Sequence, residues 1–184
     1  MKIWECSIDL VKYLSESVDS LHGQKVLELG CGAALPGIFC LKKGQVSDLH
    51  LQDFNPEVID HITKPNLHLN QGSQNNEIAS QVRLFSGDWS DFLDKMSKES
   101  MKYDLILTSE TIYEEANYYK LLSIFDQLLQ SNGSILLAAK IHYFGVGGGL
   151  RSFEKCLQSK WTFRTVFENN DTVKREIIEI RRKN

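Results

Sequence analysis

The sequence predicts a doubly wound α/β fold, a three-layer sandwich in which a mostly parallel sheet of seven strands has helices on both faces and ends in a C-terminal antiparallel hairpin. Short apolar runs alternate with segments of helical periodicity along most of the chain. The first apolar run ends in two nearly adjacent glycines, Gly30 and Gly32, and the second ends in Asp53. This layout is typical of nucleoside-binding domains, because glycines let the backbone approach a ligand and the carboxylate accepts hydrogen bonds from ribose hydroxyls.

Five apolar runs bounded by polar residues or glycine suit strands that are buried on both faces of a parallel sheet. In chain order they are residues 25–29, 48–53, 81–86, 103–109 and 134–140. The helical candidates between them are residues 4–17, 36–43, 56–69, 89–96 and 115–129. Strand–helix alternation with short links favours right-handed crossovers between parallel strands.

Local signals mark several helix ends. Pro36 fits a first helical position, where its missing N–H costs nothing, and Gly44 fits the end of the same helix. Asn55 before Pro56 is typical of a helix N-cap. The first helix presents one apolar face, made by Ile3, Cys6, Leu10, Tyr13 and Leu14.

The C-terminal part of the chain alternates apolar and polar residues over 161–168 and 174–181, with a polar turn at 169–171. This pattern predicts a terminal antiparallel hairpin at the edge of the sheet. Residues 66–80 form the one link that is poor in apolar side chains, and we expect them to be a mobile surface loop.

Composition sets the broad class. The chain has 184 residues, 42% of them hydrophobic, which favours a single domain over 1–184. A net charge of -3 gives no basic surface for nucleic acid, and no apolar run is long enough to cross a bilayer. The start of the chain lacks the apolar core of a signal peptide. The 4 cysteines form no CxxC pair, so we expect reduced thiols in an intracellular protein without a metal site.

The residues after the two glycines narrow the choice of ligand. A dinucleotide-binding loop needs a third glycine so that the pyrophosphate can rest on the helix N-terminus. That position holds Leu35, followed by Pro36, and Gly37 comes too late. A ligand without diphosphate that carries adenosine and an amino-acid tail suits this loop, so we expect S-adenosylmethionine, with Asp53 on its ribose and the glycines beside its methionine portion. The alternative is that the glycines make only a tight turn.

Five motifs are more specific than this general layout and indicate a particular family. They are residues 2–7, 51–55, 85–89, 105–113 and 142–149. Together they resemble the eukaryotic protein-histidine methyltransferase 1 family, a seven-β-strand, class I methyltransferase family with a Rossmann-like fold. The most specific are Thr-Ser-Glu-Thr-Ile-Tyr at 108–113 and Tyr-Phe-Gly-Val-Gly-Gly-Gly at 143–149. Related lysine methyltransferases carry Asp-x-x-Tyr after the fourth strand, where this chain has Glu110 and Tyr113.

The resemblance implies a set of residues that bind S-adenosylmethionine. They are Ile3, Trp4, Glu5, Cys6, Ser7, Gly30, Asp53, Phe54, Asn55, Gly87, Asp88, Trp89 and Ser109, to which the glycine turn itself adds Gly32. By residue type, Phe54 and Trp89 can flank the adenine and Asp88 can accept from its amino group. Glu5 can meet the ammonium of the amino-acid tail. Trp4 and Trp89 have core packing as the alternative role, and Glu5 has that of a solvated helix charge.

The implied reaction needs orientation more than a strong base. A lysine acceptor, with a free pKa of about 10.4, must first lose a proton, whereas imidazole, near 6.5, is largely neutral at physiological pH. The polar residues after the fourth and fifth predicted strands border the crevice, because ligands bind at the carboxyl ends of parallel strands. We expect Glu110 or Tyr113 to orient the acceptor ring. His142 is a candidate general base, with a structural histidine as the alternative, and Tyr143 lies beside it.

Residues 145–149 are unusually rich in glycine. We expect a loop on the substrate side whose backbone approaches a peptide, and the alternative is a simple turn into a helix at Leu150. Many members of the family carry an extension ahead of the motif at 2–7. If that extension helps to recognise the substrate, the chain as given would bind the cofactor yet methylate poorly.

The resemblance also implies a partner. Family members modify a histidine of a large-subunit ribosomal protein and act in the cytoplasm and nucleus, and we expect a monomer that contacts neither membrane nor nucleic acid directly. Two other functions remain open. The same fold and cofactor could serve a lysine or a small non-protein acceptor, and a non-catalytic binding module could retain the pocket.

Overall fold

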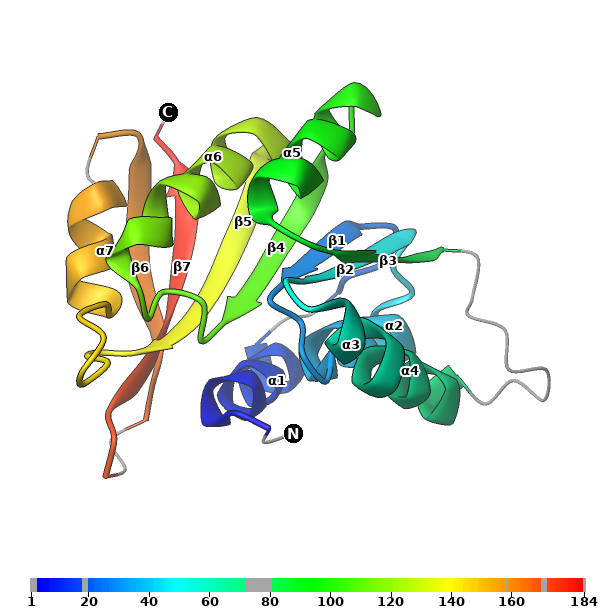
Figure 1. Ribbon diagram of the computed structural model, residues 1–184, viewed down its shortest axis with the longest axis horizontal. Helices are drawn as coiled ribbons and strands as arrows, with labels where there is room; N and C mark the ends of the chain where they lie inside the picture. Colours follow the sequence, from blue (N-terminus) through cyan, green and yellow to red (C-terminus); the bar gives the residue numbers. More distant parts are fainter. Residues whose placement is uncertain (1–2, 18–19, 72–80, 158, 170–171, 184) are drawn as a thin grey trace.

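The computed structural model describes residues 3–17, 20–71, 81–157, 159–169 and 172–183, and Figure 1 shows a twisted sheet with helices on both sides. The described strands form one seven-stranded sheet in the order β3-β2-β1-β4-β5-β7-β6. Their bounds are β1 Lys25–Leu29, β2 Asp48–Asp53, β3 Val82–Ser86, β4 Tyr103–Ser109, β5 Leu129–Lys140, β6 Trp161–Asn169 and β7 Arg175–Arg182. The pairs from β3 to β5 are parallel, whereas β7 is antiparallel to both β5 and β6. The predicted fold class is therefore confirmed.

The helices divide into two groups, which lie on opposite sides of the strands in Figure 1. One group comprises α1 Glu5–Ser17, α2 Leu35–Gly44, α3 Pro56–Val58 and α4 Lys64–Gln71, and the other comprises α5 Trp89–Lys98, α6 Tyr118–Leu128 and α7 Leu150–Leu157. Each group covers its own hydrophobic core against one face of the sheet. Alternate residues of a strand serve the two cores, since Val26 belongs to one and Leu27 to the other. None of the described helices is long and apolar enough to cross a membrane.

The first helix matches the prediction except at its start. Cys6, Leu10 and Leu14 are buried on its inner face. Ile3 is not part of that face, because it precedes the helix and is 45% exposed. Asn55 occupies the N-cap position of α3 as predicted, but its side chain makes no capping hydrogen bond.

The predicted helix over 56–69 is continuous in the chain but not regular. A five-residue π-helical turn, Ile59–Thr63, separates α3 from α4. In this wider turn the buried Thr63 hydroxyl donates to the carbonyl of Gly32 at 2.8 Å, which ties the helix to the glycine turn after β1. The helix also continues to Gln71, so the predicted loop over 66–80 is wrong for its first residues and otherwise lies outside the described residues.

The bounds of α6 and the start of β5 also differ from the prediction. A short 3₁₀ turn, Glu115–Asn117, precedes α6, which ends at Leu128 rather than one residue later. β5 begins at Leu129, earlier than the predicted 134, because extra residues of β5 bulge out opposite the Tyr103/Leu105 step of β4 and allow Leu129 to pair with Tyr103. The predicted hairpin is confirmed in β6 and β7, and most of its predicted turn lies outside the described residues.

A buried histidine lies on β2, next to the edge strand β3. His50 of β2 is fully buried, and its Nδ1 shares a hydrogen bond of 2.7 Å with the Tyr103 hydroxyl on β4's first residue. Its Nε2 has no hydrogen-bond partner among the described residues. Burial first, and the positive charge of Arg83 second, lower the pKa of His50 to about 4.

Because the pKa of His50 is lowered in the folded protein, the free energy of unfolding decreases as the pH falls. The unfolded imidazole takes up a proton near pH 6.5, whereas the folded one resists until about pH 4, so its contribution is complete above pH 6.5 and is lost as the pH falls toward 4. Between pH 7 and pH 5 the loss is about 2 kcal/mol. We expect His50→Gln to reduce the pH dependence of urea unfolding by this amount. The exposed His22 is the control, and an equal reduction in His22→Gln would contradict the assignment.

Candidate active site

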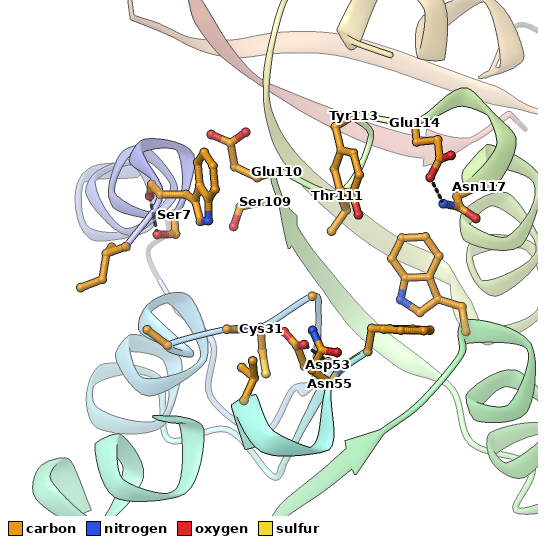
Figure 2. Close-up of a pocket in the computed structure, with 18 of the residues that line it drawn as sticks. Ser7, Cys31, Asp53, Asn55, Ser109, Glu110, Thr111, Tyr113, Glu114 and Asn117 are labelled. Carbon is orange, nitrogen blue, oxygen red and sulfur yellow. Dashed lines mark hydrogen bonds between the residues drawn. The ribbon is translucent and has the colours of Figure 1, made fainter. Parts of the chain in front are cut away.

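A cavity of about 910 Å³ lies at the carboxyl ends of the parallel strands. This is the size of a small-molecule site, and it lies where ligands bind in doubly wound folds. Figure 2 shows two opposing walls. Cys31 lies after β1, and Asp53 and Asn55 lie at and after the end of β2. They face Ser109 and Glu110, which lie at and after the end of β4. The walls therefore join three strand ends that the sequence keeps far apart.

Most of the predicted site residues line this cavity. They are Ile3, Trp4, Ser7, Gly30, Gly32, Asp53, Phe54, Asn55, Asp88, Trp89, Ser109, Glu110 and Tyr113. Four predicted residues do not line it: Glu5 and Cys6 in α1, Gly87 after β3 and the exposed His142. Cys6 is fully buried, and burial raises the pKa of its thiol, so the side chain stays a neutral core group.

The glycine turn after β1 depends on backbone conformations that side chains disfavour. Gly30 and Gly32 have φ of 63° and 51°, in the left-handed region. A Cβ on Gly30 would lie 2.7 Å from Cγ2 of Thr111, so the two walls approach each other directly at this point. The turn is also tied to β2, because the Cys31 N–H donates to the Gln52 carbonyl at 2.9 Å.

Asp53 holds the turns after β1 and β2 together. Its Oδ2 accepts from the Gly32 N–H at 3.0 Å, and its Oδ1 accepts from the Asn55 N–H at 3.1 Å. Each carboxylate oxygen has a further lone pair, so a side chain fixed in this way can still accept from a ligand. Gly87 supports the turn from outside the cavity, because its N–H donates to the carbonyls of Asp53 and Phe54.

The N-terminus of α2, which follows the glycine turn, differs from the helix end that binds diphosphate in dinucleotide-binding domains. The buried Glu28 of β1 accepts from the Gly37 N–H at 2.7 Å, so one of the free donors of the helix N-terminus is already used. Pro36 contributes no N–H, and Leu35 lines the cavity. Burial raises the pKa of Glu28 to about 8. The helix end that seats diphosphate in dinucleotide-binding domains is therefore not available for it here.

The third side of the cavity comes from the start of α5. The Trp89 indole N–H donates to Oε1 of Gln52 at 2.9 Å, and Gln52 in turn donates to the Gly87 carbonyl at 2.8 Å. Asp88 caps α5, with Oδ1 accepting from the Ser90 N–H at 2.8 Å and Oδ2 paired with Lys120 at 2.6 Å. The Lys120 ammonium holds the pKa of Asp88 below its usual range. Trp89 and Asp88 are thus fixed before any ligand arrives.

The wall after β4 carries the predicted acceptor-side residues. Glu110 has φ of 58°, and its N–H donates to the Ala138 carbonyl at 3.0 Å. Tyr113 is 47% exposed at the cavity and packs edge-on against Tyr143, with ring centroids 6.4 Å apart. After β5 it is Tyr143, not His142, that lines the cavity.

The glycine-rich segment after β5 packs against the chain itself. A Cβ on Gly148 would lie 2.4 Å from the carbonyl oxygens of Ile112 and Tyr113, and the Gly148 N–H donates to the Tyr113 carbonyl at 3.0 Å. The buried Gly148 and Gly149 are therefore required for internal packing rather than for the approach of a peptide. Only Val146 of this segment lines the cavity.

Apart from Tyr143, the remaining lining residues were not among the predicted site residues. They are Cys31, Ala33, Leu35, Val58, Thr111, Glu114, Asn117, Lys120 and Val146. Those before residue 59 flank the glycine turn or Asp53 and could have been found by proximity along the chain. Asn117 and Lys120 come from the start of α6, and their place depends on how that helix docks. Among the described residues, no group of His, Cys, Asp and Glu side chains could hold a metal ion.

Comparison with known proteins gives concordant results. The family described as "Lysine methyltransferase" matches residues 1–146. "Histidine protein methyltransferase 1 homolog" of Dictyostelium discoideum is 44% identical over 99% of this chain and 57% of its own length, and that of Bos taurus is 42% identical over 98% and 54%. The chain thus spans little more than half of these relatives. Magnesium protoporphyrin IX methyltransferase of Synechocystis, solved with bound SAH, has the same fold, with a TM-score of 0.70 at 14% identity over 96% of this chain and 82% of its own.

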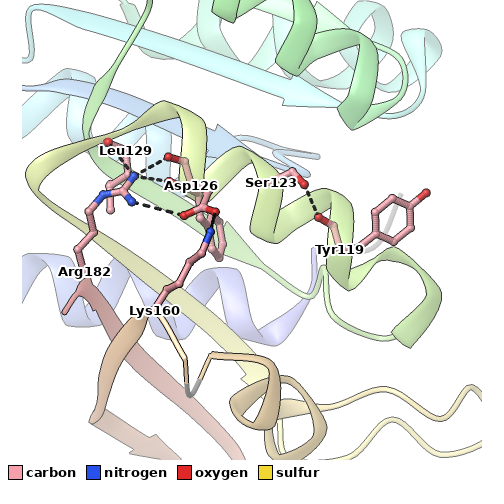
Figure 3. Close-up of polar contacts among 7 residues, drawn as sticks. Tyr119, Ser123, Asp126, Leu129, Lys160 and Arg182 are labelled. Carbon is pink, nitrogen blue, oxygen red and sulfur yellow. Dashed lines mark hydrogen bonds and ion pairs between the residues drawn. The ribbon is translucent and has the colours of Figure 1, made fainter.

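Tyr118 of α6 connects the two segments that carry Tyr113 and Tyr143. Its buried hydroxyl accepts from the Gly149 N–H at 2.9 Å and lies 3.1 Å from the Ile112 carbonyl and 2.8 Å from the Ser152 hydroxyl. The other end of α6 is anchored by β7 (Figure 3). There Arg182 donates to the carbonyl of Asp126 at 2.7 Å and to that of Leu129 at 3.3 Å.

We expect Tyr118→Phe to lower the free energy of unfolding by about 1–3 kcal/mol, because the Gly149 N–H would be left buried without its acceptor. Tyr119→Phe is the matched control. Its ring is 63% exposed and points away from the neighbouring contacts in Figure 3, so its removal of a hydroxyl should change stability by less than about 0.5 kcal/mol. Urea unfolding of both variants measures the difference. Equal stabilities would show that the Tyr118 hydroxyl does not hold the two segments.

Proposed function

This chain belongs to the methyltransferase family described as "Lysine methyltransferase", and on that premise we propose that it transfers a methyl group from S-adenosylmethionine to a histidine imidazole nitrogen of another protein. The observation that carries the choice of histidine is the similarity to histidine protein methyltransferase 1 over 99% of the chain at 44% identity. The matched region covers 99% of the chain and therefore spans both walls of the cavity, not only the cofactor side.

The residues of the cavity fit S-adenosylmethionine. Asp53, held by two backbone N–H groups, has free lone pairs for the ribose hydroxyls. Phe54, 65% exposed, and the fixed Trp89 ring supply apolar surface for adenine. The glycine turn admits the amino-acid portion, and a helix start already occupied by Glu28 disfavours a diphosphate ligand. When bound, the cofactor supplies an electrophilic sulfonium methyl group.

We call the wall after β4, which carries Glu110 and Tyr113, the acceptor wall. It has to hold one neutral imidazole ring in line with the methyl group. The Glu110 carboxylate and the Tyr113 hydroxyl can each hydrogen-bond the imidazole nitrogen that is not methylated, and this selects the tautomer whose other nitrogen has a free lone pair. After transfer the ring carries a positive charge. It returns to neutrality by releasing the N–H proton toward Glu110 or to water.

We extend the proposal to the biological setting on the family resemblance alone. The acceptor histidine lies in a large-subunit ribosomal protein, and the protein acts as a monomer in the cytoplasm and nucleus without binding nucleic acid itself. The second candidate function is methylation of lysine, which the description of the matching family favours.

A labelling experiment separates the two acceptors. The chain is incubated with S-adenosylmethionine labelled in its methyl group and a heat-treated ribosomal fraction, and the protein is hydrolysed to amino acids. We expect label in methylhistidine, with a heat-treated ribosome-free extract as the comparison for the ribosomal target. Label in methyllysine would establish the second function instead.

We expect Asp53→Ala to weaken binding of S-adenosylhomocysteine at least about tenfold and to abolish methylation, because the ribose acceptor and two hydrogen bonds of the turns are lost together. Calorimetric titration measures the affinity. Asp94→Ala removes an exposed carboxylate of α5 outside the cavity and should bind as the parent does. Unchanged affinity in Asp53→Ala would refute the assignment of the ribose site.

We expect Tyr113→Phe to reduce kcat while it leaves cofactor affinity unchanged, because only the acceptor side loses a hydrogen bond. Steady-state kinetics with the ribosomal fraction, together with the same titration, separates the two effects. A loss confined to cofactor affinity would move Tyr113 to the cofactor side of the cavity.

A further inference from the structure

The ammonium group of Lys140 lies beside Glu110 of the acceptor wall. Lys140 ends β5, and its Nζ lies 3.5 Å from Oε1 of Glu110, which follows the neighbouring strand β4. The same ammonium lies 5.0 Å from the centroid of the Trp4 ring and 5.4 Å from that of Tyr143. We call these four side chains the ammonium corner.

Three of the four side chains of the ammonium corner border the cavity. Trp4, Tyr143 and Glu110 line the cavity, whereas Lys140 does not. The side chains of Glu110 and Lys140 are only 9% and 17% exposed, so water screens their charges poorly. Glu110 Oε1 has no hydrogen-bond partner among the described residues, which leaves Lys140 as its compensating charge.

A carboxylate and two aromatic rings around one position form an arrangement that attracts an alkylammonium ion. It would suit the side chain of a lysine acceptor entering from the cavity. Here the chain's own lysine already fills this position, so the corner is electrically neutral as a whole. A second ammonium would gain the carboxylate but meet the charge of Lys140 at short range. A neutral imidazole meets no such repulsion and can still hydrogen-bond to Glu110.

We propose that Lys140 determines the acceptor: by filling the ammonium corner it excludes lysine side chains and leaves the wall suited to a neutral imidazole. The inference rests on the proposed function, since it explains why a protein of this family would modify histidine. Lys140 acts through Glu110 and the two rings and is a specificity-determining residue, not a catalytic one.

The test uses side-chain analogues and does not depend on turnover. n-Butylammonium represents lysine and 4-methylimidazole represents histidine, both at pH ~8.5, where the first is charged and the second neutral. Binding to the chain saturated with S-adenosylhomocysteine is followed through the NMR signal of the Trp4 indole N–H. We expect the parent to bind 4-methylimidazole and to bind n-butylammonium at least about tenfold more weakly.

Lys140→Met should bind n-butylammonium at least about tenfold more tightly than the parent does, and Lys140→Gln repeats the test if the first variant folds poorly. Lys140→Arg keeps the charge and should exclude n-butylammonium as the parent does. Lys64→Met, which removes an equal charge from the exposed face of α4, controls for net charge and should also resemble the parent. Equal n-butylammonium affinity in the parent and in both neutral Lys140 variants would overturn the proposal.

The labelling experiment then distinguishes a failure of the charge exclusion by Lys140 from a failure of the proposed function. If Lys140→Met gains n-butylammonium binding while the parent labels no histidine, the charge exclusion stands and the proposed function fails. If the parent labels methylhistidine and both neutral variants still exclude n-butylammonium, the function stands and Lys140 has no part in choosing the acceptor.

Discussion

The site depends on one carboxylate that joins two loops. Asp53 accepts from the backbone of Gly32 on one side and of Asn55 on the other, so the turn after β1 and the turn after β2 have a fixed separation. The left-handed conformation of Gly32 aims its N–H at this carboxylate, and the π-helical turn lets Thr63 hold the carbonyl of the same residue. The side chain that we propose as the ribose ligand thus also shapes the floor of the pocket.

Two ionisable side chains are buried in neighbouring strands, Glu28 in β1 and His50 in β2. Glu28 holds the first turn of α2 by accepting from Gly37, and burial raises its pKa to about 8, so the interaction persists as a hydrogen bond whether or not the group is charged. Burial favours the neutral form of His50 as well, in this case by lowering its pKa to about 4. Neither residue touches the cavity, yet Glu28 decides which ligands fit, since it uses the helix end on which a diphosphate would otherwise rest.

Much of the fold could be predicted because parallel strands buried on both faces leave a strong mark in the sequence. The predicted bounds of β1, β2 and β4 agree with the structure. The predicted start of β5 was too late, because Leu129 pairs with β4 ahead of a bulge that composition does not encode. On the site, motif positions placed Asp53 and Glu110 correctly at the cavity. Lys120 was missed because its position depends on the docking of α6, and Tyr143 rather than His142 faces inward because the segment after β5 is turned by its contacts with Tyr113.

In our proposal, the residue type after β4 does not by itself define the acceptor. Glu110 adopts a left-handed conformation that costs an ordinary residue about 1–2 kcal/mol, and it is held there by its N–H bond to Ala138 and by the nearby Lys140. Both partners belong to β5, so the neighbouring strand fixes the position of this carboxylate and also balances its charge. An acidic residue that follows β4 can favour an ammonium or a neutral ring. In our proposal, the side chain that β5 places behind it, here Lys140, decides between them.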